Sequence, residues 1–309
     1  MSDENIKRLN TGDKLVWYLN HHIRYFKFHK ERALQELLNH PAIQSGLAPF
    51  VAALLVAELL QRLRLSGLSI IAGFTATVFL ASNFSVDPLT ATRKIVWLGI
   101  AASMVGVLLA GFNLSGVNGS VWRPVLSILS GAAAIWVGLP ILQHQALNVA
   151  LQWGVGCALF VTWLVFWMDG LHDTSVRAGS AGMALGLGTG GAALLGGSGL
   201  LGQFGLAVGA AAGAYLMIQM VGNRRLPCGR SYTLPLSLIT GLLACVAVLT
   251  TQLPWYALIP LALIPLAAKI PVSEKLMLWV QSLLLSAATL SCAATAVYLT
   301  WRVAGAPPF

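Results

Sequence analysis

Residues 178–221 constrain the fold more than any other stretch, because they carry no charged side chain and are rich in glycine. Glycine recurs at every fourth position in two ladders: Gly182, Gly186 and Gly190, then Gly205, Gly209 and Gly213. In water so much glycine destabilises a helix. In lipid the backbone has no water to bond and stays helical. The stretch therefore predicts membrane helices.

A short break, Gly-Gly-Ser-Gly at 196–199, divides this stretch into two halves. We therefore predict a helical hairpin. Small residues four apart form a flat stripe where another helix can approach closely, which predicts close helix packing along both glycine ladders. The alternative is that such spacings arise by chance in a chain so rich in small residues.

The composition extends this prediction to the whole chain. Of its 309 residues 57% are hydrophobic and 9% charged, whereas a soluble domain carries about 25% charged residues. One crossing needs roughly 20 apolar residues, so residues 41–309 predict an all-α, polytopic bundle of about ten helices, with nine or ten crossings. We place the spans at 42–62, 66–83, 95–112, 121–140, 148–168, 178–195, 199–221, 234–251, 254–268 and 276–300.

Residues 1–40 form a separate, basic N-terminal segment. They hold seven of the 19 Lys and Arg residues, and 14–30 have the apolar spacing of an amphipathic helix. Two placements fit: a helix lying among anionic lipid headgroups, or a helix packed on the protein itself or on a partner. Four histidines lie here without a carboxylate or cysteine constellation, so we predict no metal site.

Few ionisable residues lie at membrane depth. Glu58 is the main one, and a charge inside the membrane is a candidate functional residue. Arg62 follows four residues later, so the two side chains can pair on one helix face. We favour this structural ion pair near the headgroups over a substrate or ion pathway through Glu58.

The densest polar cluster outside the N-terminal segment is residues 169–174, which lead into the glycine hairpin. Asp169 and Asp173 would share a face if the helix continued, and His172 lies between them. Two carboxylates beside a histidine can bind a cation or relay protons. The alternative, which we favour, is that Asp173 or Thr174 caps the next helix.

The ninth span is short and holds or borders four prolines: Pro254, Pro260, Pro265 and Pro271. Prolines interrupt helices, so we expect a kinked span or one that enters without fully crossing. Interrupted helices often hold the binding sites of transporters.

No motif indicates an enzyme, and we predict none. Gly186, Gly188 and Gly191 have the spacing of a dinucleotide fingerprint. That motif needs a preceding strand and a βαβ unit, and a membrane helix provides neither. No catalytic residue, metal or other cofactor follows from the sequence.

The distribution of cations predicts the orientation, because Lys and Arg favour the cytoplasmic side. Numbered after the span that each follows, the even loops and the C-terminal end hold only three: Arg93, Lys94 and Arg302. The odd loops hold nine: Arg62, Arg64, Arg123, Arg177, Arg224, Arg225, Arg230, Lys269 and Lys275. We expect odd loops in the cytoplasm. The basic N-terminal segment then conflicts with a full crossing of the first span, and its charge slightly favours a tail inside.

These features predict a multi-pass protein of a bacterial inner membrane or its equivalent. Our leading hypothesis is a small-solute permease with a path beside the glycine hairpin and the ninth span. The alternative is a non-transporting structural or accessory subunit that packs through its glycine-rich helices. Under both hypotheses we expect the protein to contact the lipid bilayer, and also a second copy of itself or another membrane subunit. The net charge of +9 does not indicate nucleic-acid binding, because its cations lie in the N-terminal segment and at helix ends.

Overall fold

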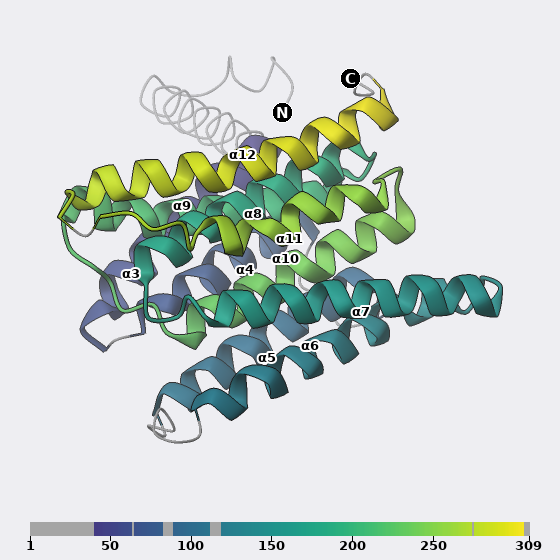
Figure 1. The fold of residues 1–309 in the computed structure, drawn as a ribbon, viewed down its shortest axis with the longest axis horizontal. Coiled ribbons are helices and arrows are strands. Elements are labelled where there is room, and N and C mark those ends of the chain that lie inside the picture. Colours follow the sequence, from purple (N-terminus) through teal and green to yellow (C-terminus); the bar gives the residue numbers. More distant parts are fainter. Residues whose placement is uncertain (1–39, 64, 83–88, 112–118, 274, 306–309) are drawn as a thin grey trace, which may run out of the picture.

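The structure is a computed structural model that describes residues 40–63, 65–82, 89–111, 119–273 and 275–305. These residues form ten α-helices, short 3-10 and π segments and no strand (Figure 1). The predicted amphipathic helix at 14–30 lies outside the described residues. In chain order the helical segments are η1 (Ile43–Leu47), α3 (Ala48–Leu60), η2 (Gln61–Leu63), η3 (Ser66–Leu68), α4 (Ser69–Ser82), α5 (Ala91–Gly111), α6 (Gly119–Leu142), α7 (Leu147–Asp169), α8 (Ser175–Leu195), α9 (Gly199–Gly222), α10 (Arg230–Thr250), η4 (Trp255–Ala257), α11 (Leu258–Ala267) and α12 (Leu278–Ala304).

The all-α polytopic bundle predicted from the sequence is confirmed. In the described part of the chain, eight helices are long and apolar enough to cross a membrane. Two shorter apolar helices, Ser66–Ser82 and Trp255–Ala267, complete the ten. Each predicted span matches one helix, and the boundaries differ by at most four residues. The protein is a multi-pass membrane protein.

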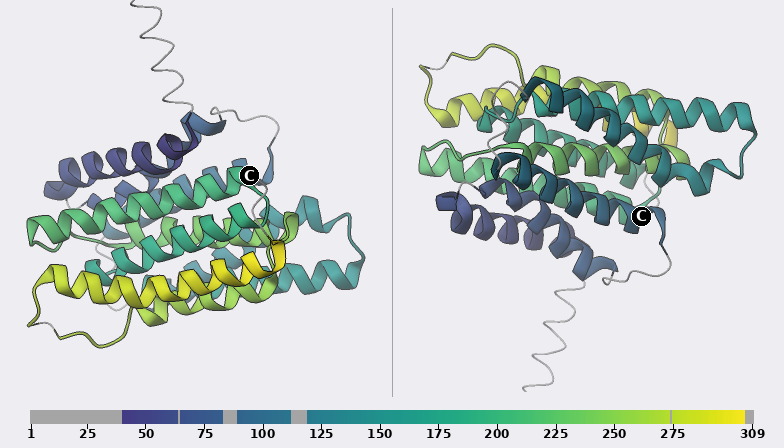
Figure 2. Two further views of the ribbon diagram at one scale, coloured as in Figure 1. Left: turned by 90° about the horizontal axis from the view of Figure 1, so that it is seen from above. Right: turned by 90° about the horizontal axis from the view of Figure 1, so that it is seen from below.

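Successive helices run in opposite directions along the bundle (Figures 1 and 2). The connections 170–174, 223–229 and 268–273 therefore gather at one end, which we call the odd-loop face. The backbone N–H of Gly229 donates to the carbonyl of His172 there. The connections 143–146, 196–198 and 251–254 gather at the other end, the even-loop face, where Gln252 donates to the carbonyl of Gly196.

The first helix runs the length of the bundle beside α4. At its start, the Gln44 amide donates to the carbonyl of Leu80 over 3.2 Å, and Thr77 donates to the carbonyl of Gln44 over 2.7 Å. Both partners lie near the end of α4, at the even-loop face. Residue 40 therefore leaves the bundle opposite the odd loops. The first helix thus starts and ends at opposite faces of the bundle, rather than entering and leaving on one side.

Helix α10 occupies the centre of the bundle. It lies between a group containing α8, α9 and α12 and a second group of α5, α6 and α7 (Figure 1). All but a few of its side chains are buried. Two glycines of α5 allow the close approach of α10: a Cβ on Gly99 would lie 2.7 Å from Ile239, and one on Gly106 would lie 2.6 Å from the Cα of Ser231.

The glycine-rich helices α8 and α9 pack against each other more extensively than any other pair of described helices. A Cβ on Gly190 would lie 2.5 Å from the backbone nitrogen of Leu206, and one on Gly205 would lie 2.5 Å from the Cα of Gly190. A Cβ on Gly186 would collide with the backbone of Gly209. The inner members of the two ladders therefore face each other with their backbones nearly touching.

The outer members of the ladders have other neighbours. Gly182 faces α10, where a Cβ would collide with the side chain of Leu236 and lie 3.0 Å from the hydroxyl of Tyr232. A Cβ on Gly213 would make an ordinary contact of 3.6 Å with the sulfur of Met183. Among the ladder glycines, the backbones of α8 and α9 thus come nearly into contact only at Gly186, Gly190, Gly205 and Gly209.

Candidate functional site

The carboxylate of Asp169 is buried at the odd-loop face, where α7 ends. It accepts two hydrogen bonds from Arg230 at the start of α10, from Nε at 2.9 Å and from Nη2 at 3.2 Å. The side chain of Arg230 is 11% exposed and that of Asp169 only 2%. This arrangement is a bidentate buried ion pair. It joins two helices and leaves the carboxylate little freedom to bind a cation.

The structure does not bring the predicted dyad of carboxylates together around His172. Helix α7 ends at Asp169, so Asp169 and Asp173 do not share a helix face. The Nδ1 atom of His172 contacts the backbone carbonyl of Asp169, and Nε2 lies 3.2 Å from the carboxylate of Asp173. Asp173 is largely exposed, and the side chain of Thr174 makes no hydrogen bond that caps α8.

Glu58 pairs with Arg224 beyond the end of α9, rather than with Arg62. Both carboxylate oxygens lie 2.7 Å from the same guanidinium nitrogen, and Gln61 donates a further hydrogen bond. The α-helix ends at Leu60 and continues as the 3-10 turn η2, which moves Arg62 away from the expected i,i+4 position. Glu58 therefore lies in an exposed interhelical ion pair. In the described residues no group of three His, Cys, Asp or Glu side chains gathers that could hold a metal ion.

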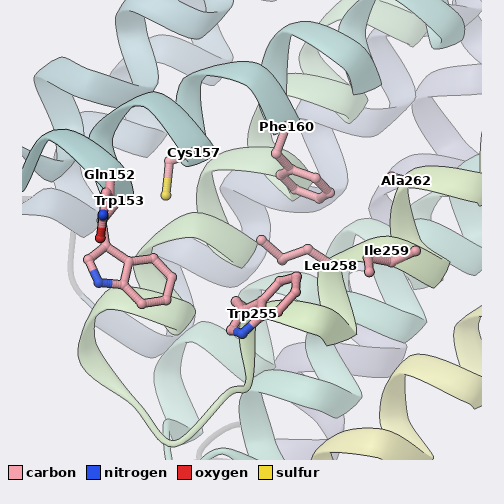
Figure 3. A pocket seen from close by; sticks show the side chains of 9 residues that line it. Gln152, Trp153, Cys157, Phe160, Trp255, Leu258, Ile259 and Ala262 are labelled. Atoms are coloured by element: carbon pink, nitrogen blue, oxygen red, sulfur yellow. The ribbon is translucent and has the colours of Figure 1, made fainter. Parts of the chain in front are cut away.

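A hollow between α7 and α11 offers a candidate binding space (Figure 3). Its volume is about 460 Å³, within the range of pockets for small ligands. Gln152, Trp153, Gly156, Cys157 and Phe160 of α7 form one side, and Trp255, Leu258, Ile259 and Ala262 form the other. Its lining residues lie near the start of both elements, so the pocket lies in the half of the bundle nearer the even-loop face.

The chemistry of this pocket is apolar with a few polar groups. No charged side chain lines it. The amide of Gln152 and the indole N–H groups of Trp153 and Trp255 are the side-chain groups of this lining that form conventional hydrogen bonds. The side chain of Trp255 is 59% exposed. Such a lining fits an uncharged ligand with an apolar body, because an unpaired charge would lose its hydration there.

The wall formed by α11 is short and is fixed at two points. The helical stretch Trp255–Ala267 is about 20 Å long, less than the roughly 30 Å of a bilayer core. Arg177 of α8 donates to the carbonyls of Ala268 and Ile270 over 2.7 and 2.9 Å, where this helix ends. The indole of Trp163 donates to the carbonyl of Ala262 over 3.0 Å. These bonds attach a short, proline-bearing helix to its neighbours.

Two features of the structure were not predicted from the sequence. Trp153 and Trp255 lie 102 positions apart and carry no motif, so nothing in the sequence indicated that they line one pocket. Lys94 counted only as a topology signal, yet it is 7% exposed. Its Nζ donates to the carbonyl of Trp136 over 3.1 Å and lies 4.6 Å from the ring centroid of that residue. A lysine one turn into an apolar helix, followed later by a tryptophan, is too common a pattern to predict this contact.

Comparison with protein-family models, with curated proteins and with solved structures finds no match for the chain.

Proposed function

We propose that the protein is a permease for a small, uncharged solute with an apolar body, which binds between α7 and α11. The pocket of about 460 Å³ carries this proposal. Its lining of aromatic and aliphatic side chains with one amide would orient such a solute without a charged partner. The solute would enter it sideways, from the lipid.

The arrangement of α11 supports a carrier. Interrupted helices line substrate sites in many transporters, and α11, which is short and holds Pro265 inside it, forms part of the pocket wall. The bonds from Trp163 and Arg177 would fix one position of this wall. During transport we expect α11 to move and to exchange these hydrogen bonds for others.

Some polar side chains in the centre of the bundle have partners within their own helix, whereas the buried hydroxyls of Tyr232 and Thr233 have none among the described residues. Ser237 and Thr240 on α10 are fully buried, but each donates to a carbonyl one turn earlier in its own helix. Their hydroxyls are thus occupied within α10. These two hydroxyls therefore have no free hydrogen to donate to a hydrophilic solute, whereas the pocket has apolar surface to contact an apolar one.

The rival hypothesis of an accessory subunit has less support in this structure. It relied on glycine stripes that would receive a partner helix. Gly186, Gly190, Gly205 and Gly209 instead face one another inside the chain. A stoichiometric protein partner recovered in mild detergent would favour the subunit.

Ligand binding tests the pocket directly. The probe is N-phenyl-1-naphthylamine, an uncharged fluorophore that brightens in apolar sites. Gly156 lines the pocket, and a Cβ there would have no neighbour within 4 Å, so the side chain in Gly156→Phe starts in open space beside the pocket. Gly46→Phe is the matched control, because Gly46 is also open and lies in η1. We expect at least tenfold weaker probe binding in Gly156→Phe and unchanged binding in Gly46→Phe.

Transport itself is tested by counterflow in proteoliposomes. Vesicles loaded with unlabelled tyrosol, a small aromatic alcohol, should transiently accumulate labelled tyrosol through the wild-type protein. Gly156→Phe should abolish this accumulation and Gly46→Phe should retain it. Probe binding without any counterflow, repeated with aliphatic and aromatic solutes of similar size, would contradict a permease and leave a binding protein.

A further inference from the structure

Two cations from different elements converge over Gly170 at the odd-loop face. A Cβ on Gly170 would lie 3.0 Å from Nη2 of Arg123 and 3.2 Å from Nζ of Lys269. Arg123 belongs to α6, and Lys269 follows α11. Because glycine has no side chain, both cationic groups can lie this close to the backbone of Gly170.

Aromatic rings and a carbonyl hold the two cations in these positions. The Nε of Arg123 donates to the carbonyl of Phe166 over 2.7 Å, and its guanidinium lies 3.8 Å from the centroid of the Phe166 ring. The Nζ of Lys269 lies 4.3 Å from the centroid of Trp167. Contacts with ring faces stabilise both charges, but they do not remove the repulsion between them.

Neither cation has a carboxylate partner among the described residues. The ion pairs there join Asp169 to Arg230, Glu58 to Arg224 and His172 to Asp173. Burial and the nearby positive charge of Arg123 both lower the pKa of Lys269. Two like charges that are held close together match the electrostatics of an anion-binding site, where one anion would offset both.

The surroundings of this pair favour a lipid as the source of the anion. The cations lie where α6, α7 and α11 reach the odd-loop face. Ile270, the neighbour of Lys269 in the chain, is apolar and 47% exposed at this end of the bundle. A phosphate over Gly170 would thus have an apolar surface beside it for acyl chains. Basic pockets between membrane helices bind anionic headgroups in this way.

We propose that Arg123 and Lys269 bind the phosphate of an anionic phospholipid over Gly170. Arg123 would contribute a planar guanidinium and Lys269 a point charge. The site is separate from the pocket between α7 and α11, whose lining residues lie in the half of the bundle nearer the even-loop face. Lipid binding can therefore succeed or fail independently of the proposed transport.

The test compares lipids added to the purified, detergent-solubilised protein. Phosphatidylglycerol, with a net negative headgroup, should raise the melting temperature, and phosphatidylcholine should raise it less. Lys269→Gln removes one of the two cations and should weaken phosphatidylglycerol binding about fivefold, from roughly 1 kcal/mol per cation. Lys275→Gln is the matched control, since Lys275 is exposed on the same connection and its removal changes the net charge equally. It should leave binding unchanged.

A charge-conserving variant keeps the test independent of folding. Lys269→Arg should restore most of the affinity that Lys269→Gln loses. Equal losses in Lys269→Gln and Lys275→Gln would overturn the site and indicate a diffuse surface effect. Inorganic phosphate at millimolar concentration should not reproduce the stabilisation. If it does so as well as phosphatidylglycerol, the site binds free phosphate and the assignment to a lipid is wrong.

Discussion

The carboxylate of Asp169 and the guanidinium of Arg230 meet through two hydrogen bonds, although the residues are 61 positions apart. The pair joins the end of α7 to the start of the central helix α10. Both side chains are largely buried, so each charge depends on the other for the interactions that water would otherwise supply. The contact therefore locks the position of α10 relative to the group of α5, α6 and α7.

The first prediction concerns this ion pair. Asp169→Asn leaves the guanidinium of Arg230 buried without its counter-charge, which costs about 3–5 kcal/mol in comparable pairs. We expect a clear fall in the melting temperature in detergent. Arg230→Gln added to Asp169→Asn should recover part of that loss, because no buried charge remains unpaired. Additive losses in the double variant would contradict the coupling.

An exposed ion pair provides the comparison. Glu58→Gln breaks the pair with Arg224, whose side chain is 46% exposed. Surface ion pairs contribute little to stability. The melting temperature should hardly change. A loss of counterflow in Glu58→Gln with normal stability would instead indicate a role in transport.

The second prediction concerns the glycine hairpin. Leucine at Gly186 adds a side chain where the backbone of Gly209 is already in contact. Overpacking commonly costs about 1–3 kcal/mol, and here the obstacle is backbone that cannot rotate away. Gly186→Leu should lower expression and the melting temperature. Gly199→Leu, at the open start of α9, should have little effect, because a Cβ there has no neighbour within 4 Å. Equal behaviour of the two variants would refute close packing.

The third prediction concerns orientation. With odd loops in the cytoplasm, Ser273→Cys should react with an impermeant maleimide only after the membrane is opened. His144→Cys, on the even-loop face, should react in intact cells. Both side chains are exposed in the structure. The reverse pattern of labelling would invert the orientation of the whole protein.

The native thiol of Cys228 should not be labelled by the maleimide in this experiment. It lies in the connection 223–229, but it is buried, and burial raises its pKa far above the usual range for a thiol. The reactive thiolate is therefore scarce at pH 7–9. Cys228 should react only after denaturation. Rapid labelling of Cys228 in the folded protein would show that the connection opens.

The fourth prediction concerns the attachment of α11. Arg177→Gln removes the two hydrogen bonds to Ala268 and Ile270. We expect faster hydrogen exchange in the segment 255–267 and weaker binding of the fluorescent probe. Arg225→Gln, at an exposed position on the same face, serves as the control. Unchanged exchange in Arg177→Gln would mean that other contacts hold the helix.

Helix positions were predictable from the sequence because the bilayer imposes a length on apolar runs. The contact between α8 and α9 was also accessible, since both helices are neighbours in the chain and their glycines repeat in register. The ion-pair partner of Glu58 could not be predicted from the sequence. Arg62 was close in sequence, but the α-helix ends before it, and Arg224 is 166 positions away.

The pocket and the pair of cations over Gly170 could not be derived from the sequence for a related reason. Each combines residues from helices that are distant in the chain. Local spacing determines which residues share one helix face, but not which helices become neighbours. Arg123 and Lys269 were therefore counted as separate topology signals, although their nitrogens approach the same glycine.

The central place of α10 has a consequence for biogenesis. Gly99 and Gly106 of α5 receive α10 as their partner, yet α10 ends only at Thr250. A ribosome that adds about 5–20 residues per second needs on the order of ten seconds to make the intervening chain. During this interval the receiving face of α5 must be covered by lipid or by the insertion machinery. A chain interrupted before Arg230 would keep that face without its partner helix.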